Sequence, residues 1–181
     1  MTARILVAYG SKHGSTGEVA AAIAERLRAA GFEAERKAAA AVDDVGGYDA
    51  VILGGALYTG RWHADAVAFL RRHARELDHV PFAVFALGPR SLEPADLAAS
   101  RKQLEGALAR SQDLEPVATA VFGGVVDPKK LRFPFNRLPA CDARDWDDIA
   151  AFALRCAEAF GFGKPAESTR PDRSELQRTP R

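Results

Sequence analysis

Short apolar runs alternate along the chain with segments whose apolar residues recur at helical spacing. The first run, residues 4–9, ends at Gly10, and its length predicts a buried strand rather than a helix. In residues 18–30 the apolar positions recur every three or four residues, which predicts an amphipathic helix with Ser15 and Thr16 as candidate caps. The chain is therefore expected to open with a strand, a short loop and a helix.

The same alternation continues toward the C-terminus. Five short apolar strands with amphipathic helices between them predict right-handed crossovers and a parallel sheet covered on both faces. The predicted fold class is thus α/β, doubly wound around a five-stranded parallel sheet. The further predicted strands are 32–36, 50–53 (ending at Gly54–Gly55), 82–87 and 116–122. The further predicted helices are 64–76, 94–110 and 145–160, and residues 38–47 are predicted to form a short helix or a loop. The apolar stripe of the last helix consists of Trp146, Ile149, Phe152, Ala153 and Cys156.

Length, composition and charge indicate a protein with one domain and argue against several classes of protein. The 181 residues, 48% of them hydrophobic, suit one core, so residues 1–161 are predicted to form one domain and residues 162–181 a disordered tail. A net charge of +1 argues against nucleic acid as a partner. Neither a membrane span nor a secretory leader is recognisable, and a soluble cytoplasmic protein is expected.

The cysteines and histidines do not suggest a metal site. Cys141 and Cys156 stand far apart without a CxxC or CxxH pattern, which fits a reducing compartment. The four histidines, His13, His63, His73 and His79, form no ligand spacing either, and no metal is predicted.

The loop after the first strand carries the most informative motif. Ser11, Lys12, His13, Gly14, Ser15 and Thr16 follow the strand and lead into the helix. Such a turn directs unpaired backbone N–H groups and the positive end of a helix dipole at one point, which suits a phosphate group. The spacing matches neither a nucleoside-triphosphate loop nor a GxGxxG dinucleotide loop. An ordinary Gly/Ser turn is the alternative interpretation.

The pattern Ser11-x-x-Gly14-x-Thr16 resembles the FMN phosphate loop of the flavodoxins, Thr/Ser-x-Thr-Gly-x-Thr, with His13 in place of the central hydroxyl residue. The resemblance implies the flavodoxin strand order 2-1-3-4-5 and FMN as cofactor. The segments 55–63 and 145–153 are similar to those of the menaquinone-dependent protoporphyrinogen oxidases, a flavodoxin-like family. This branch implies transfer of electrons between a small substrate and a quinone.

The resemblance also implies two loops that contact the flavin ring. Aromatic side chains stack on such a ring, so Tyr58 and Trp62 are candidates, although both could instead cover the sheet edge. In flavodoxins a peptide of the first ring loop turns when the flavin N5 gains a hydrogen, and Gly60 is the candidate for that position. The predicted ring-contacting residues are Ala56, Leu57, Tyr58, Thr59, Gly60 and Trp62 in the first loop, and Leu87, Gly88 and Arg90 in the second, where Arg90 could equally just solvate the turn.

The segment 125–144 is shorter than the corresponding insertion of the quinone-using family. Its basic and aromatic residues are predicted either to rest on an anionic membrane or a partner protein, or to pack on the sheet edge; they are Lys129, Lys130, Arg132, Phe133 and Phe135. The near-neutral charge favours an FMN-dependent oxidoreductase acting on a small substrate or quinone. The alternatives are a non-catalytic electron carrier for a redox protein, and a flavodoxin-shaped domain that has lost FMN.

Overall fold

Five parallel strands form the central sheet of the computed structural model, which describes residues 2–58, 60–111 and 114–163. Their order is β2–β1–β3–β5–β6, which confirms the predicted flavodoxin-like order when the strands are counted along the chain. A short strand, β4 (Arg61–Trp62), runs antiparallel to the end of β3. The five bounds are β1 (Arg4–Gly10), β2 (Glu33–Ala38), β3 (Ala50–Tyr58), β5 (Phe82–Leu87) and β6 (Ala118–Phe122).

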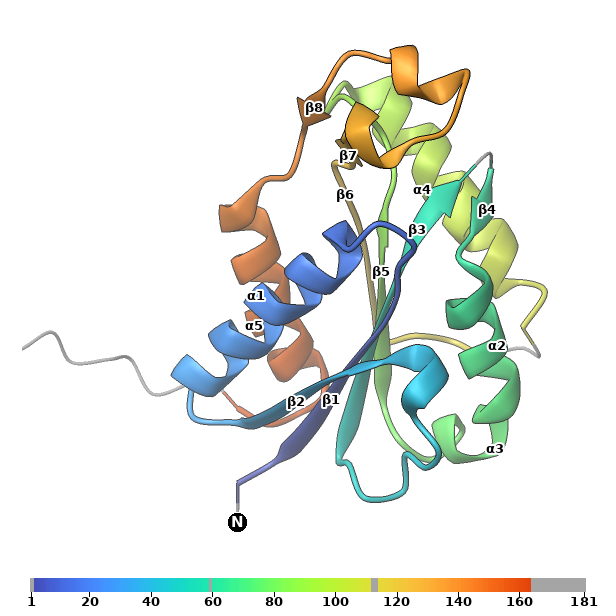
Figure 1. Ribbon diagram of the computed structural model, residues 1–181. Helices are drawn as coiled ribbons and strands as arrows, with labels where there is room; N and C mark the ends of the chain where they lie inside the picture. The colour runs from blue at the N-terminus through green and yellow to red at the C-terminus, as the bar shows by residue number, and fades with distance from the viewer. Residues whose placement is uncertain (1, 59, 112–113, 164–181) are drawn as a thin grey trace, which may run out of the picture.

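Helices cover both faces of this sheet (Figure 1). On one face lie α1 (Ser15–Ala29) and α5 (Trp146–Ala159). On the other face lie α2 (Ala64–Arg72), α3 (Ala74–Leu77) and α4 (Pro94–Leu108). A 3₁₀ turn, η1 (Ala39–Ala41), follows β2 on this second face. The side chains of β1 explain the arrangement, because Ile5 and Val7 pack into one core and Leu6 and Ala8 into the other. An apolar strand buried on both faces needs a helical layer on each.

Helix α5 packs against α1 and the phenylalanines of the sheet. Asp145 caps its N-terminus through hydrogen bonds from the amides of Asp147 and Asp148. Phe152 and Cys156 are buried as predicted, and burial raises the pKa of the Cys156 thiol to about 12. Trp146 corrects the predicted stripe: it is 45% exposed, because it lies in the first turn and its ring stacks under Arg144 instead of entering the core.

The structure corrects two predicted boundaries. The helix expected over 64–76 is divided at His73, whose buried ring packs 4.6 Å from that of Phe69 and whose Nε2 lies 3.3 Å from the Val42 carbonyl oxygen. The third strand continues through Gly54 and Gly55 to Tyr58 rather than ending at the glycines. Their missing side chains make room for Phe85 and Trp62, so these glycines serve packing and not a turn.

Between β6 and α5 the chain makes an insertion, residues 125–144, which lies over the carboxyl edge of the sheet (Figure 1). It is built from a two-stranded antiparallel ribbon and two 3₁₀ turns, none of which the hydrophobic pattern predicted. They are β7 (Val125–Val126), β8 (Cys141–Asp142), η2 (Pro128–Lys130) and η3 (Phe135–Arg137).

The predicted division of the chain at residues 161 and 162 stays a prediction, since residues 164–181 lie outside the described residues. Among the described ranges, no helix is both long and apolar enough to cross a membrane.

Candidate functional site

The loop between β1 and α1 has the geometry of an anion site. Gly14 occupies the N-cap position with φ 94°, and its amide donates to Ser11 Oγ at 2.9 Å. No side chain of the described residues caps the helix, and the first backbone bond inside α1 runs from the Glu18 amide to the Gly14 carbonyl. The amides of residues 15–17 therefore have no acceptor within the helix, and the helix dipole adds positive potential there.

Thr16 has the feature of this loop that most favours a bound ligand. Its side chain is completely buried, yet Oγ1 has no hydrogen-bond partner within the described part of the chain. A buried hydroxyl without a partner costs about 1–3 kcal/mol, so such groups are rare unless a ligand completes them. This corrects the expectation that Ser15 and Thr16 cap the helix: both lie inside its first turn, because Gly14 takes the cap position.

The other loop residues are more open. Lys12 and Gly14 are exposed, Ser11 and Ser15 are half-buried, and the His13 ring meets the Tyr58 ring edge-on at 6.1 Å. Tyr58 also lies 6.3 Å from the ring of His63, the residue that caps α2. The structure therefore brings the phosphate loop and the first ring loop together through three aromatic rings.

His63 lies beside these loops, although the sequence analysis did not single it out as a candidate site residue. A Cβ placed on Gly10 would lie 2.7 Å from its Nδ1, so the ring packs directly against the end of β1. Its position just before a helix was the available signal, since a cap residue precedes the first turn.

The first ring loop is part of the β3–β4 hairpin. Ala56 is buried, Leu57 is half-buried, and Gly60 has φ 78°, a conformation that glycine adopts without strain. Tyr58 is 37% exposed, and partial burial raises the pKa of its hydroxyl. Tyr58 is thus available to stack on a flat ring, whereas Thr59 lies outside the described residues.

Trp62 does not have the predicted role. Its side chain is 4% exposed and packs in the core beneath β3, and its indole N–H donates to the Gly55 carbonyl oxygen at 3.0 Å. Because the residue is buried and its polar group is already hydrogen-bonded, this indole covers the sheet edge, which was the alternative interpretation.

The second ring loop follows β5. Leu87 is buried, and the Gly88 amide donates to the Phe122 carbonyl, so the backbone there is held against β6. Gly88 is also closely packed, because a Cβ on it would lie 2.9 Å from Ser100 Oγ and 3.1 Å from Leu57 Cδ1. Arg90 is exposed.

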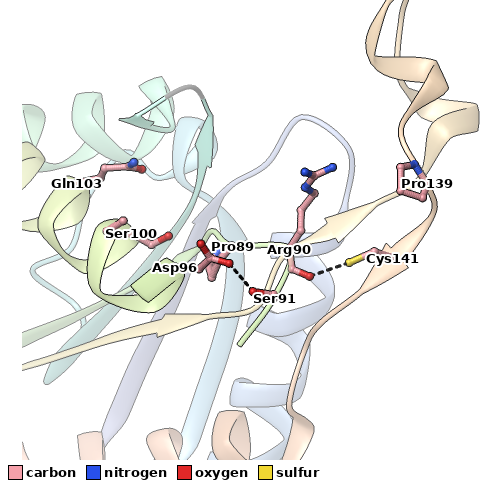
Figure 2. Close-up of a pocket in the computed structure, with 9 residues that line it drawn as sticks. Pro89, Arg90, Ser91, Asp96, Ser100, Gln103, Pro139 and Cys141 are labelled. Atoms are coloured by element: carbon pink, nitrogen blue, oxygen red, sulfur yellow. Dashed lines mark hydrogen bonds between the residues drawn. The ribbon is translucent and has the colours of Figure 1, made fainter. Parts of the chain in front are cut away.

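A cavity of about 520 Å³ opens between this loop, the start of α4 and the insertion. Figure 2 shows its rim, where Ser91 Oγ hydrogen-bonds to Asp96 and the Cys141 thiol donates to the Arg90 carbonyl oxygen at 3.1 Å. Pro89, Ser100 and Gln103 also line it. The hydrophobic pattern did not predict this cavity, because its walls come from segments about 50 residues apart.

An ion pair joins the insertion to the first turn of α1, just after the phosphate loop. The Arg144 guanidinium lies 2.5 Å from Glu18 in the first turn of α1 and 2.6 Å from Asp142. Its hydrogen bond lowers the pKa of the Asp142 carboxyl. Phe133 is 69% exposed, which contradicts packing of this ring on the sheet; its face meets Arg137 at 5.0 Å. The side chain of Phe135 is not among those that the structure describes.

Together, the strand order and the phosphate-type loop at the end of β1 define a flavodoxin-like α/β domain. A family model described as a flavodoxin domain matches residues 6–138. The chain belongs to this flavodoxin domain family, its cofactor is FMN, and it is a redox protein of the flavodoxin type.

Relatives agree with this assignment. Protoporphyrinogen IX dehydrogenase [quinone] of Escherichia coli is 22% identical over 172 residues, covering 85% of this chain and 94% of that protein. Two solved structures show the same fold. A cysteine-to-serine mutant of flavodoxin from Pseudomonas aeruginosa has a TM-score of 0.56 and 16% identity, and the match covers 87% of this chain and 99% of that one. A flavodoxin from Streptococcus pneumonia TIGR4 has a TM-score of 0.55 and 17% identity, and the match covers 86% of this chain and 99% of that one.

Proposed function

We propose that this protein is an FMN-dependent oxidoreductase that oxidises a small anionic substrate of the protoporphyrinogen type and passes the electrons to a quinone. The observation that carries the proposal is the cavity of about 520 Å³ beside the second ring loop. Its volume falls in the range of about 300–1,000 Å³ typical of small-molecule sites. The similarity to protoporphyrinogen IX dehydrogenase over most of both chains supports the same class of substrate.

The residues of the chain hold and orient the reactants. FMN, when bound, supplies the electron-accepting and electron-donating chemistry. The free amides of residues 15–17 and the Thr16 hydroxyl would hold its phosphate, and Tyr58 and the backbone of Gly60, Leu87 and Gly88 would border its ring. Arg90, at the rim of the cavity, would attract a carboxylate of the substrate.

Net charge favours an enzyme over a diffusing carrier. Strong charge of one sign steers a carrier onto its partner protein, whereas this chain carries 25 basic and 24 acidic side chains. A non-catalytic electron carrier is the alternative function, and turnover with isolated components separates the two.

The test is an anaerobic assay of the purified FMN-loaded protein with protoporphyrinogen IX and a soluble menaquinone analogue. We expect repeated turnover in which one quinone is reduced for every two electrons removed from the substrate. Reduction of a redox partner protein without any turnover of the small substrate would instead establish the carrier function.

Arg90→Gln provides a site-specific prediction for this assay. We expect KM for protoporphyrinogen to rise about tenfold with kcat changed less than about twofold, because the guanidinium attracts the substrate without touching the reacting atoms. Arg101→Gln is the matched control, since Arg101 is an exposed arginine of α4 that does not line the cavity. Equal effects of both substitutions would exclude Arg90 as a substrate contact.

Peripheral membrane contact through the insertion is a second part of the proposal, supported by exposed Phe133 beside exposed Lys129 and Arg132. Each basic residue near an anionic surface contributes about 1 kcal/mol. We expect sedimentation with vesicles of phosphatidylglycerol but not of phosphatidylcholine, and a clear reduction for Phe133→Ser. Undiminished sedimentation of the Phe133→Ser protein would show that the ring does not contact the lipid.

A further inference from the structure

A lysine of the insertion reaches the phosphate loop. Lys130 ends the 3₁₀ turn η2, and its Nζ lies 3.4 Å from the carbonyl oxygen of His13. The two residues are 117 positions apart in the sequence, so only the tertiary structure brings them together. A contact of this length to a neutral carbonyl is weak, and the flexible stem of a lysine allows the ammonium to move to a stronger acceptor nearby.

A small cavity of about 80 Å³ lies between the loop and the insertion. The loop contributes His13 and Ser15 to its wall, the first turn of α1 contributes Glu18, and the insertion contributes Lys130 and Asp127. Ser15 begins α1, and its amide is one of those without an acceptor inside the helix. Lys130 and Ser15 therefore line the same small cavity at the start of α1.

Arg144, which also lines this cavity, is not available as a counter-charge. Its side chain is 8% exposed and its guanidinium is held between the carboxylates of Glu18 and Asp142, so two negative charges already surround it. Lys130 is different: its side chain is 53% exposed, and the carboxylate recorded beside it in the described structure, that of Asp127, lies 3.9 Å away. An exposed ion pair at that distance contributes little.

We propose that the ammonium of Lys130 is a counter-charge for the FMN phosphate, which makes the insertion part of the cofactor site and a determinant of selectivity for FMN over riboflavin. In this arrangement Lys130 exchanges the His13 carbonyl for a phosphate oxygen, a charge-assisted contact. The proposal rests on FMN binding at the β1–α1 loop and is independent of the substrate and the electron acceptor.

The test measures the dissociation constants of FMN and riboflavin by quenching of flavin fluorescence, with the full chain freed of cofactor. For Lys130→Gln we expect FMN binding about five- to tenfold weaker and riboflavin binding unchanged, the size expected for a partly exposed charge-assisted contact. Lys130→Arg should retain most of the FMN affinity. Lys129→Gln is the matched control, because Lys129 is an exposed lysine of the same turn that does not line the cavity, and should change FMN affinity less than about twofold.

Two results would overturn the proposal. If Lys130→Gln and Lys129→Gln bind FMN equally well, Lys130 does not contact the phosphate. If Lys130→Gln weakens riboflavin as much as FMN, the lysine acts through the fold of the insertion and not through the phosphate. Because both measurements read binding, a failure here is distinct from a failure of the turnover assay, which tests the substrate.

Discussion

Thr16→Val is expected to weaken FMN binding by about tenfold or more while making the cofactor-free protein more stable by about 1 kcal/mol. The two effects have one cause. The Thr16 hydroxyl is fully buried and has no hydrogen-bond partner among the described residues, so in the absence of phosphate it is a buried polar group left unpaired. Valine has nearly the same shape and removes that cost, but it cannot donate to a phosphate oxygen.

The measurements are urea unfolding of the cofactor-free protein and fluorescence titration with FMN and riboflavin. Riboflavin lacks the phosphate, so its affinity should be the same for Thr16→Val and the unsubstituted protein. Thr119→Val, at an exposed position of β6 remote from the loop, is the matched control and should leave FMN binding unchanged. An equal loss of affinity for both flavins would mean that Thr16 does not meet the phosphate.

Gly54→Ala is expected to destabilise the fold by about 3 kcal/mol or more. A Cβ on Gly54 would lie 2.0 Å from Cζ of Phe85, whose ring is fully buried. Phe85 cannot move aside easily, because Phe122 and Phe152 pack around it with ring centroids 5.9 and 6.4 Å away. The added methyl group must therefore displace either this ring cluster or the backbone of β3.

Chemical denaturation of the cofactor-free variants measures this effect. Gly106→Ala is the matched control, because this glycine of α4 has open space around its Cα, and alanine there should stabilise the helix by about 0.5–1 kcal/mol. The double substitution Gly54→Ala with Phe85→Leu should destabilise less than the sum of the two single changes. An effect of Gly54→Ala below about 1 kcal/mol would contradict the close packing.

The fold could be predicted from the sequence because each strand repeats the same local signal. A run such as residues 82–87 is too short for a helix and apolar on both faces, and the structure confirms it as β5, buried along its whole length. Boundaries set by tertiary contacts were not predictable in this way. Gly54 and Gly55 have the composition of a strand end, yet they lie inside β3 because Phe85 and Trp62 occupy the space of their absent side chains.

The candidate site also has a part that the sequence predicts and a part that depends on tertiary contacts. The loop residues from Ser11 to Thr16 are contiguous, so their spacing alone predicts a phosphate-type turn, and the free helix start and the orphaned Thr16 hydroxyl agree with it. The cavity beside Arg90 and the contact between Lys130 and His13 depend on how the insertion folds over the sheet edge. The residue pattern of the insertion or of the sheet-edge loops, taken alone, does not predict how they come together.

By itself, the sequence determined the α/β class, the strand order through its resemblance, and the position of the phosphate loop. These follow from apolar periodicity and local backbone chemistry, which neighbouring residues encode. Only the tertiary structure decided that Trp62 belongs to the core, that Tyr58 stays open beside His13 and His63, and that the insertion meets the loop. Such pairings join residues distant in the chain, and their outcome depends on which side chains compete for the same buried space.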